Sequence, residues 1–204
     1  NNAVGSLSTA FNNAEYGDVI TFAESLFEDA DGERIVPEIA QTGAWYPPQG
    51  VVVIAPHRLR ISATNRQFLH APNVNLHNNW ALRVFCNIDF VNCQFTYAAA
   101  YFLNCGFYGG SRHVVNVQGE QPIEFVNCVF ADNNFTASNY PFVSRSAASP
   151  IVFKNCAIVG NVTAANKFVY NNANVVGFES SLTDISFREV EANATDANFI
   201  SVAT

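Results

Sequence analysis

Carboxylates are the residues of this sequence that could most readily do chemistry. Hydrolysis of a glycosidic bond needs two carboxyl groups at a defined separation, one acting as acid and the other as base or nucleophile. Asp89 and Glu124 each stand between an isoleucine and a phenylalanine, so both are expected to face solvent from a strand. No second acid flanks either one, and the other acids of this region are also isolated: Glu120, Asp132 and Glu179. We therefore predict no catalytic residues.

No metal or cofactor site is recognisable either. The sequence contains neither a CxxC pair nor a Cys/His cluster. Asp29-x-Asp31-Gly32 has the form of the start of a calcium loop, but the remaining ligands of an EF-hand are absent. Phosphate-loop and dinucleotide-binding motifs are also missing. We predict no metal and no cofactor, and a solvated loop around Asp31.

Three N-x-[ST] sequons, beginning at Asn134, Asn161 and Asn193, could carry N-linked glycans. Each falls in a loop or just after an expected strand, where a glycan would point outward. A chain rich in asparagine also produces such triplets by chance. The prediction of glycosylation therefore applies only if the chain passes through a eukaryotic secretory pathway.

The composition limits the class of protein. The chain has 204 residues, enough for one substantial core, with 49% hydrophobic and only 13% charged residues. The net charge of −7 makes nucleic acid an improbable partner. No apolar run approaches the roughly 20 residues of a membrane-spanning helix. Met is absent even at position 1, so we expect a processed product or a fragment, located outside the cell or at its surface.

A short phrase, Phe-x-Asn-Cys, recurs four times between residues 88 and 159. Successive phenylalanines are separated by 12, 23 and 28 residues, and an apolar residue follows two places after each Cys. Such uneven self-similarity indicates stacked structural units. The repeat residues are Phe90, Asn92, Cys93, Phe102, Asn104, Cys105, Phe125, Asn127, Cys128, Phe153, Asn155 and Cys156.

The phrase is typical of a strand that ends in a sharp corner. Ile123 and Phe125 alternate with Pro122, Glu124 and Val126, and the alternation resumes one residue out of phase after Asn127. Asparagine tolerates the left-handed conformation that a corner requires. Stacked corners would form an asparagine ladder beside columns of Phe and Cys.

The five Cys could form disulfides between neighbouring coils, or a buried column of thiols. We favour the buried column, because each repeat Cys takes an inward position that a Val would also fill.

On this phrase and its spacing, the chain resembles the right-handed parallel β-helix of the pectate-lyase-like superfamily. The phrase also resembles the Phe-x-x-Asn repeats of chlamydial polymorphic membrane proteins, although their Gly-Gly-Ala-Ile repeats are absent here. Enzymes of the first group use clustered Asp residues, with calcium and an arginine base in the lyases. The missing acid cluster implies a non-catalytic member.

The predicted fold is all-β: a single right-handed parallel β-helix (solenoid) domain over 1–204, with an N-terminal capping helix in 1–16. The coils fill 17–204 and are clearest at 85–180. Apolar spacing predicts the helix at 4–15, and further strands are expected at 19–22, 50–55, 58–63, 68–69, 74–76, 82–85, 167–170, 175–178, 185–187 and 198–203.

We expect a non-catalytic extracellular structural protein, such as a filament or surface-layer subunit or an adhesin segment. Open β-helix ends favour head-to-tail self-association, or continuation into neighbouring domains of a longer chain. The alternative is a protein that binds or cleaves polysaccharides in an outer groove, with Trp45, Tyr46 and Arg58 as candidate contacts.

Overall fold

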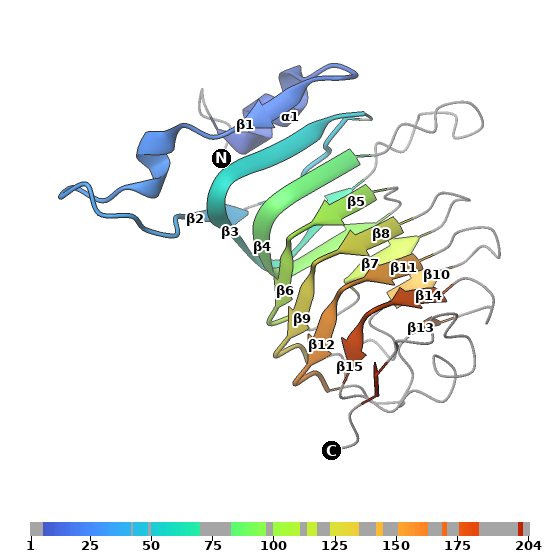
Figure 1. Cartoon of the computed structure of the whole chain (residues 1–204). Helices are drawn as coiled ribbons and strands as arrows, with labels where there is room; N and C mark the ends of the chain where they lie inside the picture. Colours follow the sequence, from blue (N-terminus) through green and yellow to red (C-terminus); the bar gives the residue numbers. More distant parts are fainter. Residues whose placement is uncertain are drawn as a thin grey trace.

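Parallel β-strands make up most of this computed structural model (Figure 1). It describes residues 6–41, 43–48, 50–69, 83–96, 100–110, 114–117, 123–134, 142–144, 151–162, 169–170, 176–183 and 200–201. The elements are α1 (Leu7–Asn13), β1 (Val19–Thr21), the 3-10 helix η1 (Glu24–Phe27), β2 (Glu38–Gln41), β3 (Val52–Leu69), β4 (Arg83–Thr96), β5 (Ala100–Leu103), β6 (Gly106–Tyr108), β7 (Val115–Val117), β8 (Ile123–Val126), β9 (Val129–Ala131), β10 (Phe142–Ser144), β11 (Ile151–Lys154), β12 (Ala157–Val159), β13 (Val169–Tyr170), β14 (Val176–Glu179), β15 (Leu182–Thr183) and β16 (Ile200–Ser201).

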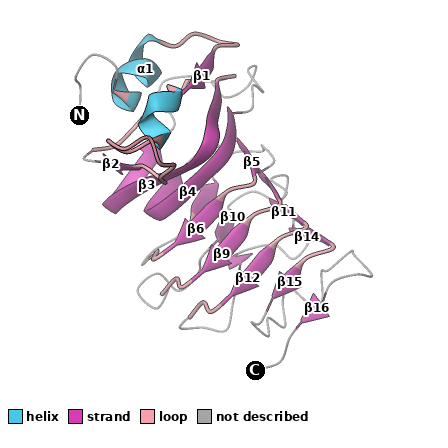
Figure 2. Ribbon diagram, turned by 60° about the vertical axis from the view of Figure 1, so that its left-hand side comes forward, coloured by secondary structure: helices cyan, strands magenta, loops and turns pink. Residues whose placement is uncertain are grey.

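The strands form one sheet that curls around an apolar interior (Figure 2). The long strand β4 bends around this interior and pairs in turn with β5, β6 and β7. Further along the chain, short strands extend three rows. The first row is β5, β8, β11 and β14; the second is β6, β9, β12 and β15; the third is β7, β10 and β13. We call the segment that adds one strand to each row a layer.

Two corners separate the rows, and both use the left-handed backbone conformation. At the first corner, between the first and second rows, the φ angles are 63° at Asn87, 53° at Asn104, 54° at Asn127, 51° at Asn155 and 49° at Ser180. The second corner has positive φ at Asn92, Gly109, Asp132 and Gly160. The prediction that the repeat asparagines adopt a left-handed corner is confirmed. Asparagine and glycine pay the least steric cost in this conformation.

The register corrects one part of the sequence interpretation. The last three copies of the phrase are equivalent, because Phe102, Phe125 and Phe153 are partners in successive strands of the first row. The first copy is displaced, since Phe90 pairs with Phe107 in the second row, and Phe85 is the residue that pairs with Phe102. The phrase specifies an apolar strand end, a corner and an inward residue. Either corner can therefore use it.

Stacked phenylalanines fill the interior behind the first and second rows. In the first row, ring centroids lie 5.4 Å apart for Phe85–Phe102 and 5.1 Å apart for Phe102–Phe125. In the second row the Phe107–Phe130 separation is 4.7 Å. Edge-to-face contacts join the two columns, as in Phe125–Phe130 at 5.0 Å. Both arrangements are favourable geometries for aromatic pairs.

Side chains at the first corner also bond between layers. Asn104 donates to the Asn87 side-chain oxygen at 2.8 Å, and Asn155 donates to that of Asn127 at 2.7 Å. These bonds are part of the expected asparagine ladder. They satisfy polar groups at the point where the strand ladder is interrupted.

The helix predicted at 4–15 is present as α1. Ser6 caps it by accepting from the Thr9 backbone N–H at 3.2 Å. Leu7 and Phe11 are buried, and the Phe11 ring contacts Trp45 edge-on at 6.0 Å between centroids. The helix thus packs its apolar face onto the core at the β1–β2 end of the sheet.

The all-β class and the parallel strands are confirmed for the described residues. Expected strands at 74–76 and 185–187 lie outside them. Among the residues that the structure describes, no helix is long and apolar enough to span a membrane.

Candidate functional site

The inward positions at the first corner are occupied by thiols. The Sγ atoms of Cys105, Cys128 and Cys156 lie 3.4, 3.3 and 3.4 Å from the backbone oxygens of the phenylalanines one layer earlier, and each donates to that oxygen. At the second corner, Cys93 makes the same kind of contact with the Ile61 oxygen, at 3.5 Å. All four are buried, unlike the half-buried Cys86, and all five cysteines are unpaired thiols.

Three of these buried thiols, Cys93, Cys128 and Cys156, have a raised pKa. Burial raises the pKa of Cys93 and of Cys128, and the neighbouring Cys128 thiol together with burial raises the pKa of Cys156. A raised pKa keeps the thiol protonated near neutral pH, and the thiolate is the reactive form. The column therefore packs and bonds the interior.

The strongest candidate for a functional site is a row of polar side chains on the outer face of the sheet. Glu38, Arg60, Asp89 and Gly106 are successive partners on β2, β3, β4 and β6. Glu38 and Arg60 are exposed, whereas Asp89 is only 7% exposed although it lies on the outer face. We call this set, with Arg58 and Tyr108 beside it, the outer polar row.

Asp89 is held beneath its neighbours. Arg58 Nε lies 3.2 Å from Asp89 Oδ1, and a second Arg58 nitrogen donates to the Asn104 backbone oxygen. Gly106 makes room for this arrangement, because a Cβ there would lie 2.3 Å from Asp89 Oδ1 and 2.2 Å from the Tyr108 ring. Asp89 Oδ1 is buried and accepts no aligned hydrogen bond within the described part of the chain.

Electrostatics set the protonation of this group. Burial raises the pKa of Asp89, and the positive charges of Arg58 and Arg60 oppose that rise. Burial and the Asp89 charge both raise the pKa of Tyr108. The cluster therefore holds a carboxyl group that gains a proton more readily than an exposed aspartate. The sequence could not show this, because Arg60 and Tyr108 reach Asp89 only through strand pairing.

A second charged group lies across the first corner. Lys154 forms an ion pair with Glu124 and lies 4.0 Å from Glu179. Glu124 pairs with Tyr101 in the first row, whereas Asp89 pairs with Gly106 in the second. Asp89 and Glu124 stand at the same place in the sequence phrase, but they do not hold equivalent positions in the fold. They stand on opposite sides of the corner.

Smaller polar contacts lie elsewhere on the described part of the chain. His57, a half-buried residue of β3, has its Nε2 atom 2.9 Å from Glu24 Oε2. Arg83 is buried and donates to the Pro47 oxygen at 2.7 Å. Burial lowers the pKa of Arg83 to about 10.

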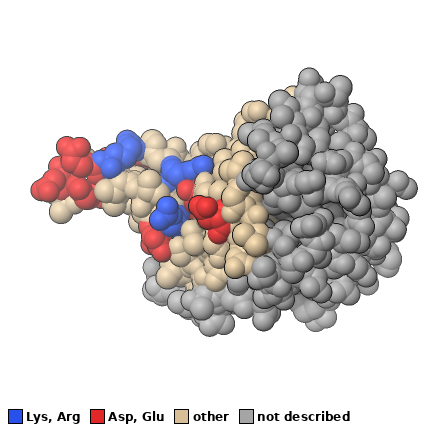
Figure 3. Space-filling model, turned by 90° about the horizontal axis from the view of Figure 1, so that it is seen from below, with Lys and Arg blue, Asp and Glu red and all other residues tan. Residues whose placement is uncertain are grey.

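Figure 3 shows acidic side chains gathered at the tip of the segment that protrudes from the sheet. In that segment Asp29 Oδ1 accepts from the backbone of Asp31 and Glu33, so the carboxylate closes its own turn.

No cation site emerges from these groups. Within the ranges described, no cluster of three or more His, Cys, Asp or Glu side chains has the geometry to hold a metal ion. Asp132 forms part of the second corner, with φ of 55°. Glu120 lies outside the described residues.

The sequons differ in their surroundings. Asn134 is exposed. The Asn161 side-chain nitrogen donates to the Phe130 oxygen at 2.9 Å and to the Val159 oxygen at 3.2 Å. Its oxygen accepts from the Asn133 side chain at 2.7 Å. Asn193 lies outside the described residues. Asn161 thus uses in the second corner the amide that glycosylation would modify.

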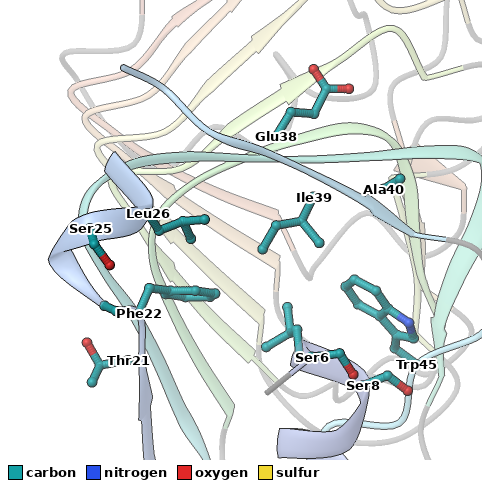
Figure 4. A pocket seen from close by; sticks show the side chains of 12 residues that line it. Ser6, Ser8, Thr21, Phe22, Ser25, Leu26, Glu38, Ile39, Ala40 and Trp45 are labelled. Carbon is teal, nitrogen blue, oxygen red and sulfur yellow. The ribbon is translucent and has the colours of Figure 1, made fainter. Parts of the chain in front are cut away.

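Trp45 and Tyr46, the aromatic pair of the proline-rich loop, separate in the structure. Trp45 is 4% exposed and packs on Phe11, whereas Tyr46 is 43% exposed. A pocket of about 730 Å³ opens beside Trp45, between α1, η1 and β2. Figure 4 shows Phe22 and Trp45 on opposite sides of this pocket, with Glu38 directed away from it.

Comparison of the chain with protein-family models, with curated proteins and with solved structures gives no match in any of the three.

Proposed function

We propose that the chain is a right-handed parallel β-helix that serves as a non-catalytic structural protein outside the cell, such as a filament or surface-layer subunit or an adhesin segment. The observation that carries the proposal is the unshifted register of three rows of parallel strands. Right-handed crossovers are the rule for parallel strands within one sheet. A resemblance to the pectate-lyase-like superfamily agrees with this geometry.

The chemistry of the described side chains supports a structural role. The inward thiols are protonated donors to the backbone, and Glu124 is neutralised by Lys154. Asp89 is covered by Arg58. Enzymes place their reactive groups where a substrate can reach them. Here the buried groups connect one layer to the next, which favours a stiff scaffold.

Self-association through a sheet edge is the mode of assembly that we propose. Among the described strands, β1 pairs only with β3. An edge strand presents backbone groups that can pair with another chain, and charged side chains on such a strand suppress that pairing. Val19 on β1 is 61% exposed and Tyr16, three residues before it, is 77% exposed, so two large hydrophobic side chains lie at this edge, with Asp18 as the charged residue between them.

Sedimentation velocity over a range of concentrations, with electron microscopy of the same samples, tests this proposal. We expect concentration-dependent linear assemblies, in which β1 of one copy pairs with β14, the last described strand of the first row, in the next copy. Val19→Lys should shift assembly to about tenfold higher concentration, because it places a charge on the edge strand. Val36→Lys is the matched control, since Val36 is 54% exposed outside any strand, and it should leave assembly unchanged. A monomer at every concentration would contradict the proposal.

A second candidate function, the binding of acidic polysaccharides, is favoured by the outer polar row. Arg60 is exposed and forms no ion pair with the described residues, so its guanidinium can bind a sugar carboxylate. Glu38 and Asp89 lie two strands apart on the same face, about 10 Å at the backbone, so the row carries two carboxyl groups of the kind that glycosidases use. Burial of Asp89 favours binding over cleavage.

Binding to polygalacturonate, followed by calorimetry, separates the two functions. If the row binds acidic chains, Arg60→Gln should weaken binding at least about fivefold, and Arg34→Gln, in the protruding segment, should not. Release of reducing ends or unsaturated sugars that disappears in Glu38→Gln would establish an enzyme. Absence of binding and cleavage would leave the structural role as the sole candidate.

A further inference from the structure

The pocket between α1, η1 and β2 lies at the end of the core that the helix covers. The apolar part of its lining comes from separate elements of the chain: Leu7, Phe22, Leu26, Ile39 and Trp45. Its volume of about 730 Å³ falls in the range of sites that bind small molecules. A seven-residue helix is too short to cover the whole end of the interior, so this space is left beside it.

The lining limits the chemistry of a ligand. Phe22 and Trp45 face the pocket from opposite sides, with Ile39 between them, so the space suits a flat or compact apolar body (Figure 4). Hydroxyl groups are supplied by Ser6, Ser8, Thr21 and Ser25. They can bond to one or two polar groups on a ligand that is otherwise apolar.

The charge of the pocket lining further limits which ligands can bind. Among the described residues, no Lys or Arg lines the pocket, and the only ionisable lining residue is Glu38, whose side chain is directed away from the centre. An anionic ligand would lose its hydration without gaining a cation, and the Glu38 carboxylate would repel it. We infer that this pocket binds an uncharged small molecule with a two- or three-ring apolar body and hydroxyl or carbonyl groups at its edge. This inference is independent of the assembly and polysaccharide proposals.

Two fluorescent probes that share one ring system test the inference. N-phenyl-1-naphthylamine is uncharged, and 1-anilinonaphthalene-8-sulfonate carries the same rings with a sulfonate. We expect saturable, one-to-one binding of the uncharged probe and at least about tenfold weaker binding of the sulfonate. Replacing Glu38 with Gln should reduce the difference in affinity between the two probes, because it removes the charge that repels the sulfonate.

Tryptophan fluorescence locates the probe. The sequence has two tryptophans, Trp45 and Trp80, so Trp80→Phe leaves Trp45 as the sole donor for energy transfer. Binding should quench Trp45 emission in this variant.

Filling the space tests the same site independently. Ser8→Phe on α1 and Ala23→Phe before η1 should each weaken binding of the uncharged probe at least about tenfold. Asn12→Phe, at an exposed position of α1 that does not line the pocket, is the matched control and should change binding less than about twofold. Circular dichroism checks that each variant is folded. No saturable binding, equal binding of both probes, or binding unaffected by both filling variants would overturn the inference.

Discussion

The hydroxyl of Ser181 takes the place that the thiol of Cys156 holds one layer earlier. Ser181 Oγ donates to the Phe153 oxygen at 3.2 Å, and Cys156 Sγ donates to the Phe125 oxygen at 3.4 Å. The two residues also touch directly, because the Cys156 backbone N–H donates to Ser181 Oγ at 3.2 Å. A small inward donor is therefore what this corner position requires, and either a thiol or a hydroxyl meets the requirement.

Replacing Ser181 measures how much this contact contributes to the stability of the fold. Ser181→Ala leaves the buried Cys156 N–H without its acceptor, so we expect a loss of about 1–3 kcal/mol in the free energy of unfolding. Ser181→Cys keeps a donor of the kind found in the preceding layers and should stay within about 1 kcal/mol of the native protein. Urea denaturation followed by circular dichroism gives both values. Equal losses in the two variants would show that the hydrogen bond is unimportant.

The state of the thiols is open to direct chemical test. We expect iodoacetamide to label at most Cys86 in the folded protein at pH 8, because the other four thiols are buried and burial raises the pKa of Cys93 and Cys128. In denaturant all five should react. Intact mass spectrometry without reductant counts the labels. A mass lower by two hydrogens with three reactive thiols after unfolding, or lower by four hydrogens with one, would indicate the disulfide alternative.

Local sequence predicted the corner and not its place in the fold. Asn92, Asn104, Asn127 and Asn155 all adopt positive φ, because the preference of asparagine for this conformation is a property of the residue and its neighbours. The assignment of Phe90 to the wrong row has the opposite origin. Two corners need the same local pattern, and only strand pairing decides between them.

The outer polar row could not be predicted from the sequence either, because strand pairing alone brings its residues together. Glu38, Arg60 and Asp89 are more than 20 residues apart in succession and become neighbours through parallel pairing. Asp89 was rightly placed on the outer face of a strand, but its burial depends on Arg58 and on the missing side chain at Gly106. No periodicity reports a contact of that kind.

The left-handed corner can be tested at Asn155. Its φ is 51°, and its side chain donates to Asn127 at 2.7 Å. Asn155→Gly keeps the conformation accessible and loses one partly exposed hydrogen bond, at an expected cost of about 0.5–1.5 kcal/mol. Asn155→Val adds the strain of a β-branched residue in this region, so its cost should be larger by about 1–2 kcal/mol. Thermal and urea unfolding compare the two. A valine variant as stable as the glycine variant would argue against the assigned corner.

Asp89 should make the stability of the protein depend on pH. Burial raises the pKa of Asp89, so the folded chain binds this proton at a higher pH than the unfolded chain does. The stabilisation is complete below the unfolded pKa of about 3.9 and is lost as the pH rises through the folded value. Between neutral pH and pH 4, the native protein should gain stability relative to Asp89→Asn as the pH falls. Arg58→Gln should extend the window to higher pH, because Arg58 opposes the rise. Parallel pH dependence in native and Asp89→Asn proteins would contradict this account.

When the chain is expressed in a eukaryotic secretory pathway, the extent of glycosylation at each sequon should depend on the role of its asparagine in the corner. A glycan on Asn161 would occupy the nitrogen that donates to the Phe130 and Val159 oxygens, and it would disturb the bond from Asn133 to the same side chain. Asn134 is exposed, and its backbone N–H donates to the Gly110 oxygen at 2.8 Å, a bond that does not use the side-chain amide. We expect glycopeptide mass spectrometry to find Asn134 modified in a much larger share of molecules than Asn161. Thr136→Ala should abolish the Asn134 glycan and leave stability nearly unchanged, whereas Asn161→Asp should destabilise the fold by about 1–3 kcal/mol. Equal occupancy of both sites would show that the second corner is open when glycans are added.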